Sequence, residues 1–184
     1  MTQPAAADFS TFSFVFDMNQ LFESFIAGFI DRHRAEVLPD ALRDCQLLPQ
    51  TRGASLHLAR DAGGRRAFRL LPDFALRHAG RFPLLLDAKY KRLDPTRPNA
   101  GVSPADFYQM HAYARRYDCP RVLLLYPRTA GAGGPSRSPF FVEGADAIIQ
   151  AATINLQVPL GSERGRAALA AELRQLLSGG VTHE

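Results

Sequence analysis

The spacing of apolar side chains changes its period along the chain. Between Asp17 and about Ala35, apolar residues recur at steps of three and four, which predicts an amphipathic helix with Asp17 as its N-cap. The apolar stripe consists of Met18, Phe22, Phe25, Ile26 and Phe29. A weaker helix is expected over residues 36–45, and residues 1–15 are expected to form a frayed lead-in.

The middle of the chain has the composition and period of strands. Extended runs are predicted at residues 55–60, 65–71, 74–77 and 83–90. Turns are expected at 61–64 and 78–82, where glycines interrupt the pattern. The continuous apolar run at residues 84–86 indicates a strand that is buried on both faces.

The second half begins with a clear helix start. After a loop at 92–102, Ser103 is a cap, Pro104 occupies the first position and Asp106 lies in the first turn of a helix that runs to about Tyr117. Further elements are a buried strand at 121–126, a flexible loop at 129–138, short strands at 140–143 and 153–158, and a helix at 162–177 stopped by Gly179. This order predicts an α+β or α/β fold with a mixed central sheet.

Length and composition fit one domain over residues 1–184. The 46% of hydrophobic residues exclude general disorder. Cys45 and Cys119 are too few for a disulfide scaffold and lack metal-ligand spacing, so a reduced compartment is expected. There is no basic signal region, and the apolar stretch 21–30, interrupted by Glu23, is too short to cross a bilayer. We therefore expect a cytoplasmic protein without a membrane partner.

The basic residues are distributed unevenly in kind. The net charge is +4, which is compatible with a polyanionic partner but does not require one. Of the 22 basic residues 20 are Arg, and the two lysines, Lys89 and Lys91, both fall within residues 87–91. Arg-biased coding is the plain explanation, and a local need for a compact ammonium group is the alternative.

Two aspartates are predicted to meet across the hairpin. If residues 74–77 and 83–86 pair about Gly80, then Asp73 lies opposite Asp87, and Lys89 shares the face of Asp87. Opposed carboxylates beside a buried strand repel each other, and a hard divalent cation such as Mg²⁺ or Mn²⁺ resolves the conflict. The alternative interpretation is that Asp73 is a turn residue after Pro72 and that Lys89 is a surface partner of Asp87.

Five segments in this order resemble the nuclease domain of the McrC family, the nuclease subunit of modification-dependent McrBC restriction systems. These segments are Phe14–Glu23, Leu71–Asp73, Leu86–Lys91, Asp106–Ala114 and Leu124–Pro127. The resemblance covers about residues 12–128 and implies the PD-(D/E)xK nuclease fold, in which a mixed sheet flanked by helices cuts DNA with Mg²⁺. It also implies that Asp73 and Asp87 are metal ligands and that Lys89 is the catalytic lysine. Gln109 and Tyr113 match the Gln and Tyr of the family's helix motif.

The resemblance further implies an McrB-like AAA+ GTPase partner. Family members carry an N-terminal domain that engages this motor, whereas the nuclease motifs of this sequence begin near Met1, so we expect that domain to be absent. The chain lacks the phosphate-binding motif G-x-x-x-x-G-K-[ST], and we expect no GTP hydrolysis by the chain itself. One active site cuts one strand, so a homodimer is one expected way to cut both.

Further candidates surround this centre. Glu23 is expected either to reach the metal or to be an exposed or Arg-paired acid. Gln109 and Tyr113 lie one helical turn apart, and they face either the site and the DNA backbone or solvent, since Phe107, Met110, Ala114 and Tyr117 supply the apolar stripe. Lys91 is either a phosphate contact or a solvated strand end. Candidate contacts to the DNA backbone are Arg32 to Arg34, Arg65, Arg66, Arg115 and Arg116.

The sequence thus favours a Mg²⁺-dependent DNA endonuclease resembling McrC. Two alternatives are a repair or recombination nuclease of the same fold and a binding or scaffolding subunit without catalysis.

Overall fold

The computed structural model describes residues 16–49, 55–129 and 134–179. The helices are α1 Met18–Arg32, α2 Arg34–Val37, α3 Pro104–Tyr117 and α4 Glu163–Ser178, with 3-10 turns at Asp40–Leu42 and Pro98–Gly101. The strands are β1 Gln46–Pro49, β2 Leu56–Arg60, β3 Arg66–Leu70, β4 Phe74–His78, β5 Arg81–Ala88, β6 Arg121–Pro127, β7 Arg137–Phe141 and β8 Ile148–Ile154. No helix within these ranges is long and apolar enough to span a membrane.

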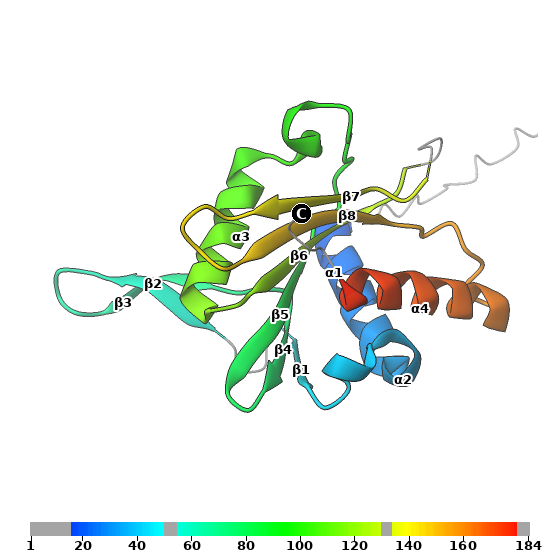
Figure 1. The fold of residues 1–184 in the computed structure, drawn as a ribbon, viewed down its shortest axis with the longest axis horizontal. Coiled ribbons are helices and arrows are strands. Elements are labelled where there is room, and N and C mark those ends of the chain that lie inside the picture. Colours follow the sequence, from blue (N-terminus) through cyan, green and yellow to red (C-terminus); the bar gives the residue numbers. More distant parts are fainter. Residues whose placement is uncertain (1–15, 50–54, 130–133, 180–184) are drawn as a thin grey trace, which may run out of the picture.

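A mixed six-stranded sheet forms the centre of the molecule, in the order β1-β4-β5-β6-β8-β7 (Figure 1). Strands β1, β4 and β5 are antiparallel, β5, β6 and β8 are parallel, and β7 returns antiparallel at the far edge. Strands β2 and β3 make a separate two-stranded sheet. The expected α/β fold with a mixed central sheet is therefore confirmed.

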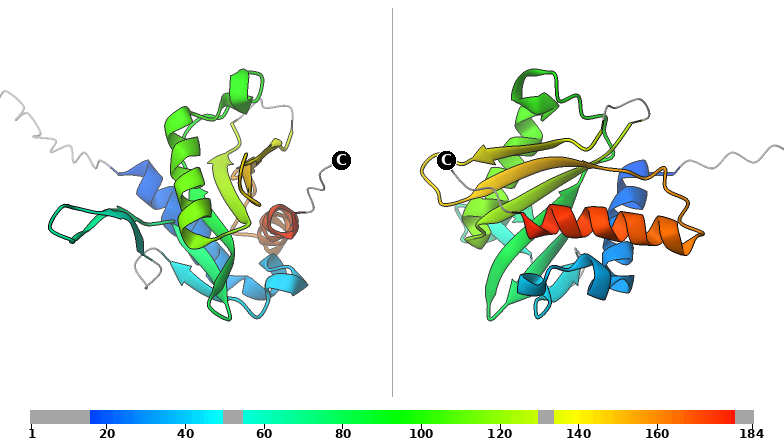
Figure 2. Two further views of the ribbon diagram at one scale, coloured as in Figure 1. Left: turned by 60° about the vertical axis from the view of Figure 1, so that its left-hand side comes forward. Right: turned by 45° about the vertical axis from the view of Figure 1, so that its right-hand side comes forward.

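Helices cover both faces of the sheet, as the two views of Figure 2 show. On one face α1, α2 and α4 pack against inward side chains such as Leu84, Leu86 and Leu123. On the other face α3 contributes Met110 and packs against the alternate positions of the same strands. Because both faces are covered, β5 and β6 are apolar at nearly every position, as the run at residues 84–86 predicts.

Local signals in the sequence fix several helix ends. The side chain of Asp17 accepts hydrogen bonds from the backbone N–H groups of Asn19 and Gln20, so the predicted N-cap of α1 is confirmed. Ser103 caps α3 through the N–H of Asp106, with Pro104 in the first turn as predicted. These caps fix the start of both helices that approach the end of β5.

Other predictions at this level are wrong. The helix expected over 36–45 is replaced by the four residues of α2 and a 3-10 turn, and the edge strand β1 follows. The last strands begin earlier than expected: β7 spans 137–141 rather than 140–143, and β8 spans 148–154 rather than 153–158. In the stripe of α1, Met18 is exposed, whereas Ile30 is buried. The lead-in 1–15 and residues 130–133 lie outside the described residues.

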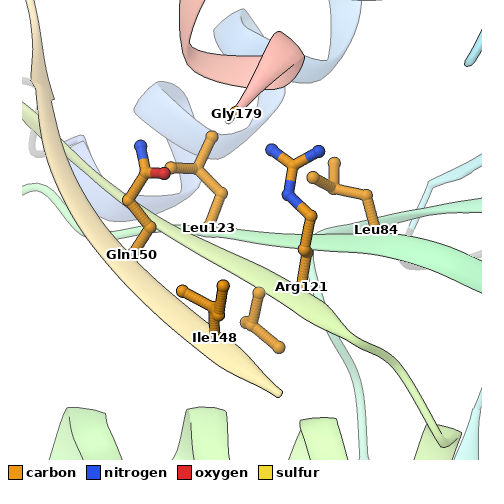
Figure 3. A pocket seen from close by; sticks show the side chains of 7 residues that line it. Leu84, Arg121, Leu123, Ile148, Gln150 and Gly179 are labelled. Atoms are coloured by element: carbon orange, nitrogen blue, oxygen red, sulfur yellow. The ribbon is translucent and has the colours of Figure 1, made fainter. Parts of the chain in front are cut away.

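The C-terminal end of α4 packs over the start of β6, as Figure 3 shows. Arg121 donates a hydrogen bond to the carbonyl oxygen of Leu177 at 3.1 Å. Beside Arg121 and Gln150 lies a cavity of about 10 Å³, which is enough for about one water molecule. This small cavity is at the opposite end of the parallel strands from Asp87, and it is too small to hold a substrate.

Candidate functional site

The two aspartates meet at one end of the β4–β5 hairpin. Phe74 pairs with Leu86, so Asp73 and Asp87 occupy the next positions on the two chain segments, in the register predicted about Gly80. A carboxylate oxygen of Asp73 accepts the backbone N–H of Ala88 at 2.6 Å. Both side chains are buried, with 6% of Asp73 and 1% of Asp87 exposed.

Burial makes both carboxyl groups harder to ionise, and the charge of Asp87 adds to this effect at Asp73. Burial, followed by the charge of Asp87, raises the pKa of Asp73 to about 8. Burial also raises the pKa of Asp87, although the nearby Lys89 opposes this effect. One end of β5 thus holds two buried acids whose ionised forms are unfavourable without a further positive charge.

Lys89 supplies one positive charge directly. Its Nζ lies 2.6 Å from Oδ2 of Asp87, and its side chain is 18% exposed. Its backbone N–H donates to the carbonyl oxygen of Leu125 at 2.8 Å, so the residue continues the pairing of β5 with β6. Burial alone would lower the pKa of Lys89, but the charges of Asp87 and Asp73 outweigh burial and raise it. Lys89 is therefore an ammonium ion at neutral pH.

Helix α1 brings Glu23 to the same place. The carboxyl of Glu23 forms a hydrogen bond with Asp73, and burial together with the charge of Asp87 raises its pKa. The start of α1 is held against the chain after β5, because Asn19 accepts the backbone N–H of Tyr90 at 3.0 Å. Glu23 thus lies with the two aspartates, and the alternative of an exposed or Arg-paired acid is wrong.

Helix α3 supports the site from the face of the sheet opposite to α1. The hydroxyl of Tyr113 donates to the carbonyl oxygen of Leu71 at 2.9 Å and accepts from Nε2 of Gln109 at 2.8 Å. Tyr113 is buried in the core and does not face solvent, whereas Phe107, expected in the apolar stripe, is only partly buried. Tyr113 and Gln109 therefore fix the backbone two residues before Asp73.

The donor set fits a hard divalent cation with few protein ligands. No three His, Cys, Asp or Glu side chains in the described ranges converge as a metal-binding group. Mg²⁺ commonly binds one or two carboxylates and completes its octahedron with water and phosphate oxygens. Asp73 and Asp87 supply such a pair, and the charge of a cation would favour the ionised forms that burial disfavours at both residues.

Comparison with known proteins identifies the family. The model of the family described as McrBC 5-methylcytosine restriction system component matches residues 2–127. The chain belongs to this McrBC family. The match includes both aspartates, Lys89 and the α3 residues of the site. The predicted resemblance is thereby confirmed.

A solved structure of an archaeal complex shows the same fold. A chain of the Thermococcus gammatolerans assembly of McrB AAA+ hexamers with bound McrC aligns with a TM-score of 0.58 at 21% identity. The alignment covers 88% of this McrBC-family chain but 33% of the other, so the chain spans about a third of the length of that relative. No curated protein matches the sequence.

Lys91 has a specific partner in this McrBC-family chain. Its Nζ lies 2.9 Å and 3.0 Å from the two carboxylate oxygens of Asp106, which is buried at the start of α3. Lys91 follows the end of β5 by three residues and its side chain is still 51% exposed, but this ion pair was neither of its two predicted roles. Sequence reasoning assigned Asp106 only to the helix start and missed this ion pair, because the partners lie on separate elements.

The predicted DNA-backbone arginines of α3 contact the protein's own backbone. Arg115 donates to the carbonyl oxygen of Gly144 at 3.3 Å, and Arg116 donates to that of His57 at 2.8 Å. Both remain exposed, so these bonds do not remove their charge from the surface. In this McrBC-family chain they connect α3 to the β7–β8 turn and to β2.

Proposed function

We propose that this McrBC-family chain is a metal-dependent DNA endonuclease that hydrolyses phosphodiester bonds. The observation that carries the proposal is the pair of buried carboxylates, Asp73 and Asp87, with the ammonium of Lys89 2.6 Å from the second of them. A purely structural role does not account for two repelling acids at the end of a buried strand. Active sites, by contrast, often hold such perturbed carboxyl groups.

The residues divide the work as follows. Asp73 and Asp87 would hold Mg²⁺ or Mn²⁺, and Glu23, which is hydrogen-bonded to Asp73, would assist through bound water. When bound, such an ion supplies Lewis-acid stabilisation of the phosphate and acidifies a water molecule. The Lys89 ammonium contacts a phosphate oxygen or orients the attacking water, since a protonated amine donates and does not accept. Tyr113 and Gln109 position the backbone next to Asp73.

The biological setting follows from the family and the structural relative. The family description refers to 5-methylcytosine restriction, and the relative's assembly joins McrB AAA+ hexamers to McrC. We propose that this chain cuts DNA as part of such a system, with an McrB-like AAA+ GTPase as partner. Co-purification with that GTPase in the presence of a non-hydrolysable GTP analogue tests the partner. Separate elution at every protein concentration would contradict it.

Cleavage by point variants tests the chemistry. We expect Lys89→Ala and Asp87→Asn each to reduce Mg²⁺-dependent cleavage of 5-methylcytosine-containing DNA by at least 100-fold, while the fold is retained. Matched controls are Arg164→Ala and Asp146→Asn, which remove the same charges, one positive and one negative, at exposed positions away from the site. The controls should cleave at the wild-type rate. Cleavage by Lys89→Ala at the wild-type rate would refute the assignment, and unmethylated and branched DNA serve as substrate comparisons.

A further inference from the structure

The β2–β3 hairpin projects away from the body of the molecule (Figures 1 and 2). It forms its own two-stranded sheet and adds nothing to the six-stranded one. Nearly all of its residues from Leu58 to Arg69 are exposed. An isolated two-stranded sheet is marginally stable in water, so a protruding pair of this kind calls for a role outside the core.

The base of this hairpin is firmly attached to α3. The hydroxyl of Tyr117 accepts the backbone N–H of the first residue of β2 and donates to the carbonyl of the last residue of β3, both at 3.2 Å. Arg116 adds its bond to His57 in β2. An open groove of about 500 Å³ beside these contacts is lined by β2, Arg66 and Arg116. The hairpin is thus held at a defined angle to the helix.

The hairpin concentrates positive charge. Residues 56–70 contain four arginines and one aspartate, a net charge of +3, whereas the whole chain has a net charge of +4. Arg65 forms an ion pair with Asp61, but the side chains of Arg66 and Arg69 form no hydrogen bond or ion pair with any described residue. Two exposed guanidinium groups on one strand are therefore available to a polyanion.

Phe68 lies between these two arginines and is unusual in two ways. Its side chain is 74% exposed, and its backbone has a φ of 54°, in the left-handed region. An aromatic residue rarely adopts this conformation, which is unfavourable by about 1–2 kcal/mol. The exposed ring gains no burial in return. Such a strained, exposed position is typical of a contact site.

The hairpin is close to the proposed catalytic centre along the chain. Asp73 comes seven positions after Arg66, and an extended chain over seven positions spans at most about 25 Å. One turn of B-form DNA is about 34 Å long. A duplex placed at the two aspartates therefore lies within one helical turn of the arginines.

We propose that the β2–β3 hairpin is a second DNA-contact element, which binds the duplex through Arg66 and Arg69, with Phe68 inserted into the groove between the phosphates. The inference rests on the proposed function only in taking DNA as the ligand. A two-stranded ribbon fits the major groove, which is about 12 Å wide. The contact increases affinity without supplying any catalytic group.

Salt-dependent binding tests the arginines. Anisotropy of a labelled 30-base-pair duplex is measured in EDTA, so that cleavage cannot occur, across a range of KCl concentrations. We expect Arg66→Gln with Arg69→Gln to bind at least about tenfold more weakly at 0.1 M salt and to lower the slope of log K against log salt by about 2. The control, Arg81→Gln with Arg164→Gln, removes the same charge at other exposed sites. A slope no lower than the control's would overturn the proposal.

Phe68→Gly separates the apolar contact from the ionic one. Glycine accepts a φ of 54° without strain, so the variant should fold at least as stably as wild type. We expect weaker binding at every salt concentration with an unchanged slope, because no phosphate contact is lost. Wild-type affinity for Phe68→Gly would remove Phe68 from the interface.

The outcomes distinguish this inference from the proposed function. If the arginine variant binds DNA like its control while Lys89→Ala abolishes cleavage, the hairpin inference fails and the nuclease assignment stands. If the arginine variant loses DNA affinity while wild type shows no metal-dependent cleavage, the reverse holds. If the variant keeps its DNA affinity but no longer co-purifies with an AAA+ GTPase, the hairpin is a protein-docking element and the DNA proposal is wrong.

Discussion

Replacing Asp73 by asparagine should stabilise the metal-free protein at alkaline pH. The side-chain oxygen of asparagine can still accept the N–H of Ala88, which is the backbone bond that Asp73 makes at 2.6 Å. The substitution therefore keeps this hydrogen bond and removes only the ionisation. The pKa of Asp73 is raised to about 8, first by burial and then by Asp87.

The sign of the effect follows from proton uptake. A carboxyl group whose pKa is about 4 in the unfolded chain and about 8 in the folded one binds a proton only in the folded state between these values. Its contribution to stability is complete below pH 4 and is lost as pH rises to 8. The loss is at most about 1.4 kcal/mol per pH unit, or up to about 3 kcal/mol between pH 6 and pH 8.

Urea denaturation in EDTA measures this difference. Wild type should lose stability steadily from pH 6 to pH 8, whereas Asp73→Asn should show a flatter profile. Asp146→Asn, an exposed change of the same type, should follow wild type. In buffer without EDTA, Mn²⁺ at 100 times its dissociation constant should raise the stability of wild type at pH 8 by about 3 kcal/mol, with little effect on Asp73→Asn. Parallel profiles of wild type and Asp73→Asn would refute the burial and repulsion argument.

Three further substitutions test the frame of the site. Tyr117→Phe removes the hydroxyl that bonds both strands of the β2–β3 hairpin, so it should lower the free energy of unfolding by about 1–2 kcal/mol and speed proteolysis of the hairpin. Unchanged proteolysis would mean that Tyr117 does not anchor the hairpin. Gly165→Ala places a Cβ against the carbonyl of Pro159 and should lower the melting temperature by several degrees. Gly161→Ala, at a position with open space, should not lower it, and equal melting temperatures for the two variants would contradict the close approach. Lys91→Ala leaves Asp106 without its cation and should lower the free energy of unfolding by about 1 kcal/mol, a small value because Lys91 is half exposed to water. Unchanged stability in urea denaturation would mean that water replaces the ion pair.

The register of the β4–β5 hairpin could be predicted because it depends on local symmetry. Gly80 lies midway between two apolar runs, and the pairing of Phe74 with Leu86 keeps that centre, although a bulge follows Leu76. Asp73 and Asp87 were thereby placed together before any three-dimensional information. The helix caps at Asp17 and Ser103 were predictable for the same reason, since each involves neighbours within three residues.

Elements whose stability comes from distant partners were missed. Strand β1 has only four residues, ends in a proline and exists because β4 offers an edge. Strand β8 is buried at six of its seven positions, so it lacks the alternation that marks a strand. The ion pair of Lys91 joins residues 15 positions apart on separate elements, which no periodic pattern indicates. Tyr113 was left out of the apolar stripe because its hydroxyl is polar, but its ring is buried in the core and its hydroxyl bonds the carbonyl of Leu71.

Helix α3 couples the two regions to which we assign function. Tyr113 and Tyr117 lie one turn apart, and the first holds the backbone of Leu71 while the second holds that of Leu70. Asp73 is two residues beyond Leu71, and the β2–β3 hairpin ends at Leu70. Because adjacent carbonyl groups are held by one helix, the hairpin cannot tilt without moving the segment that carries Asp73. If the hairpin binds DNA as we propose, the duplex would be held at a fixed offset from the two carboxylates, which is the geometry that positioning a scissile phosphate requires.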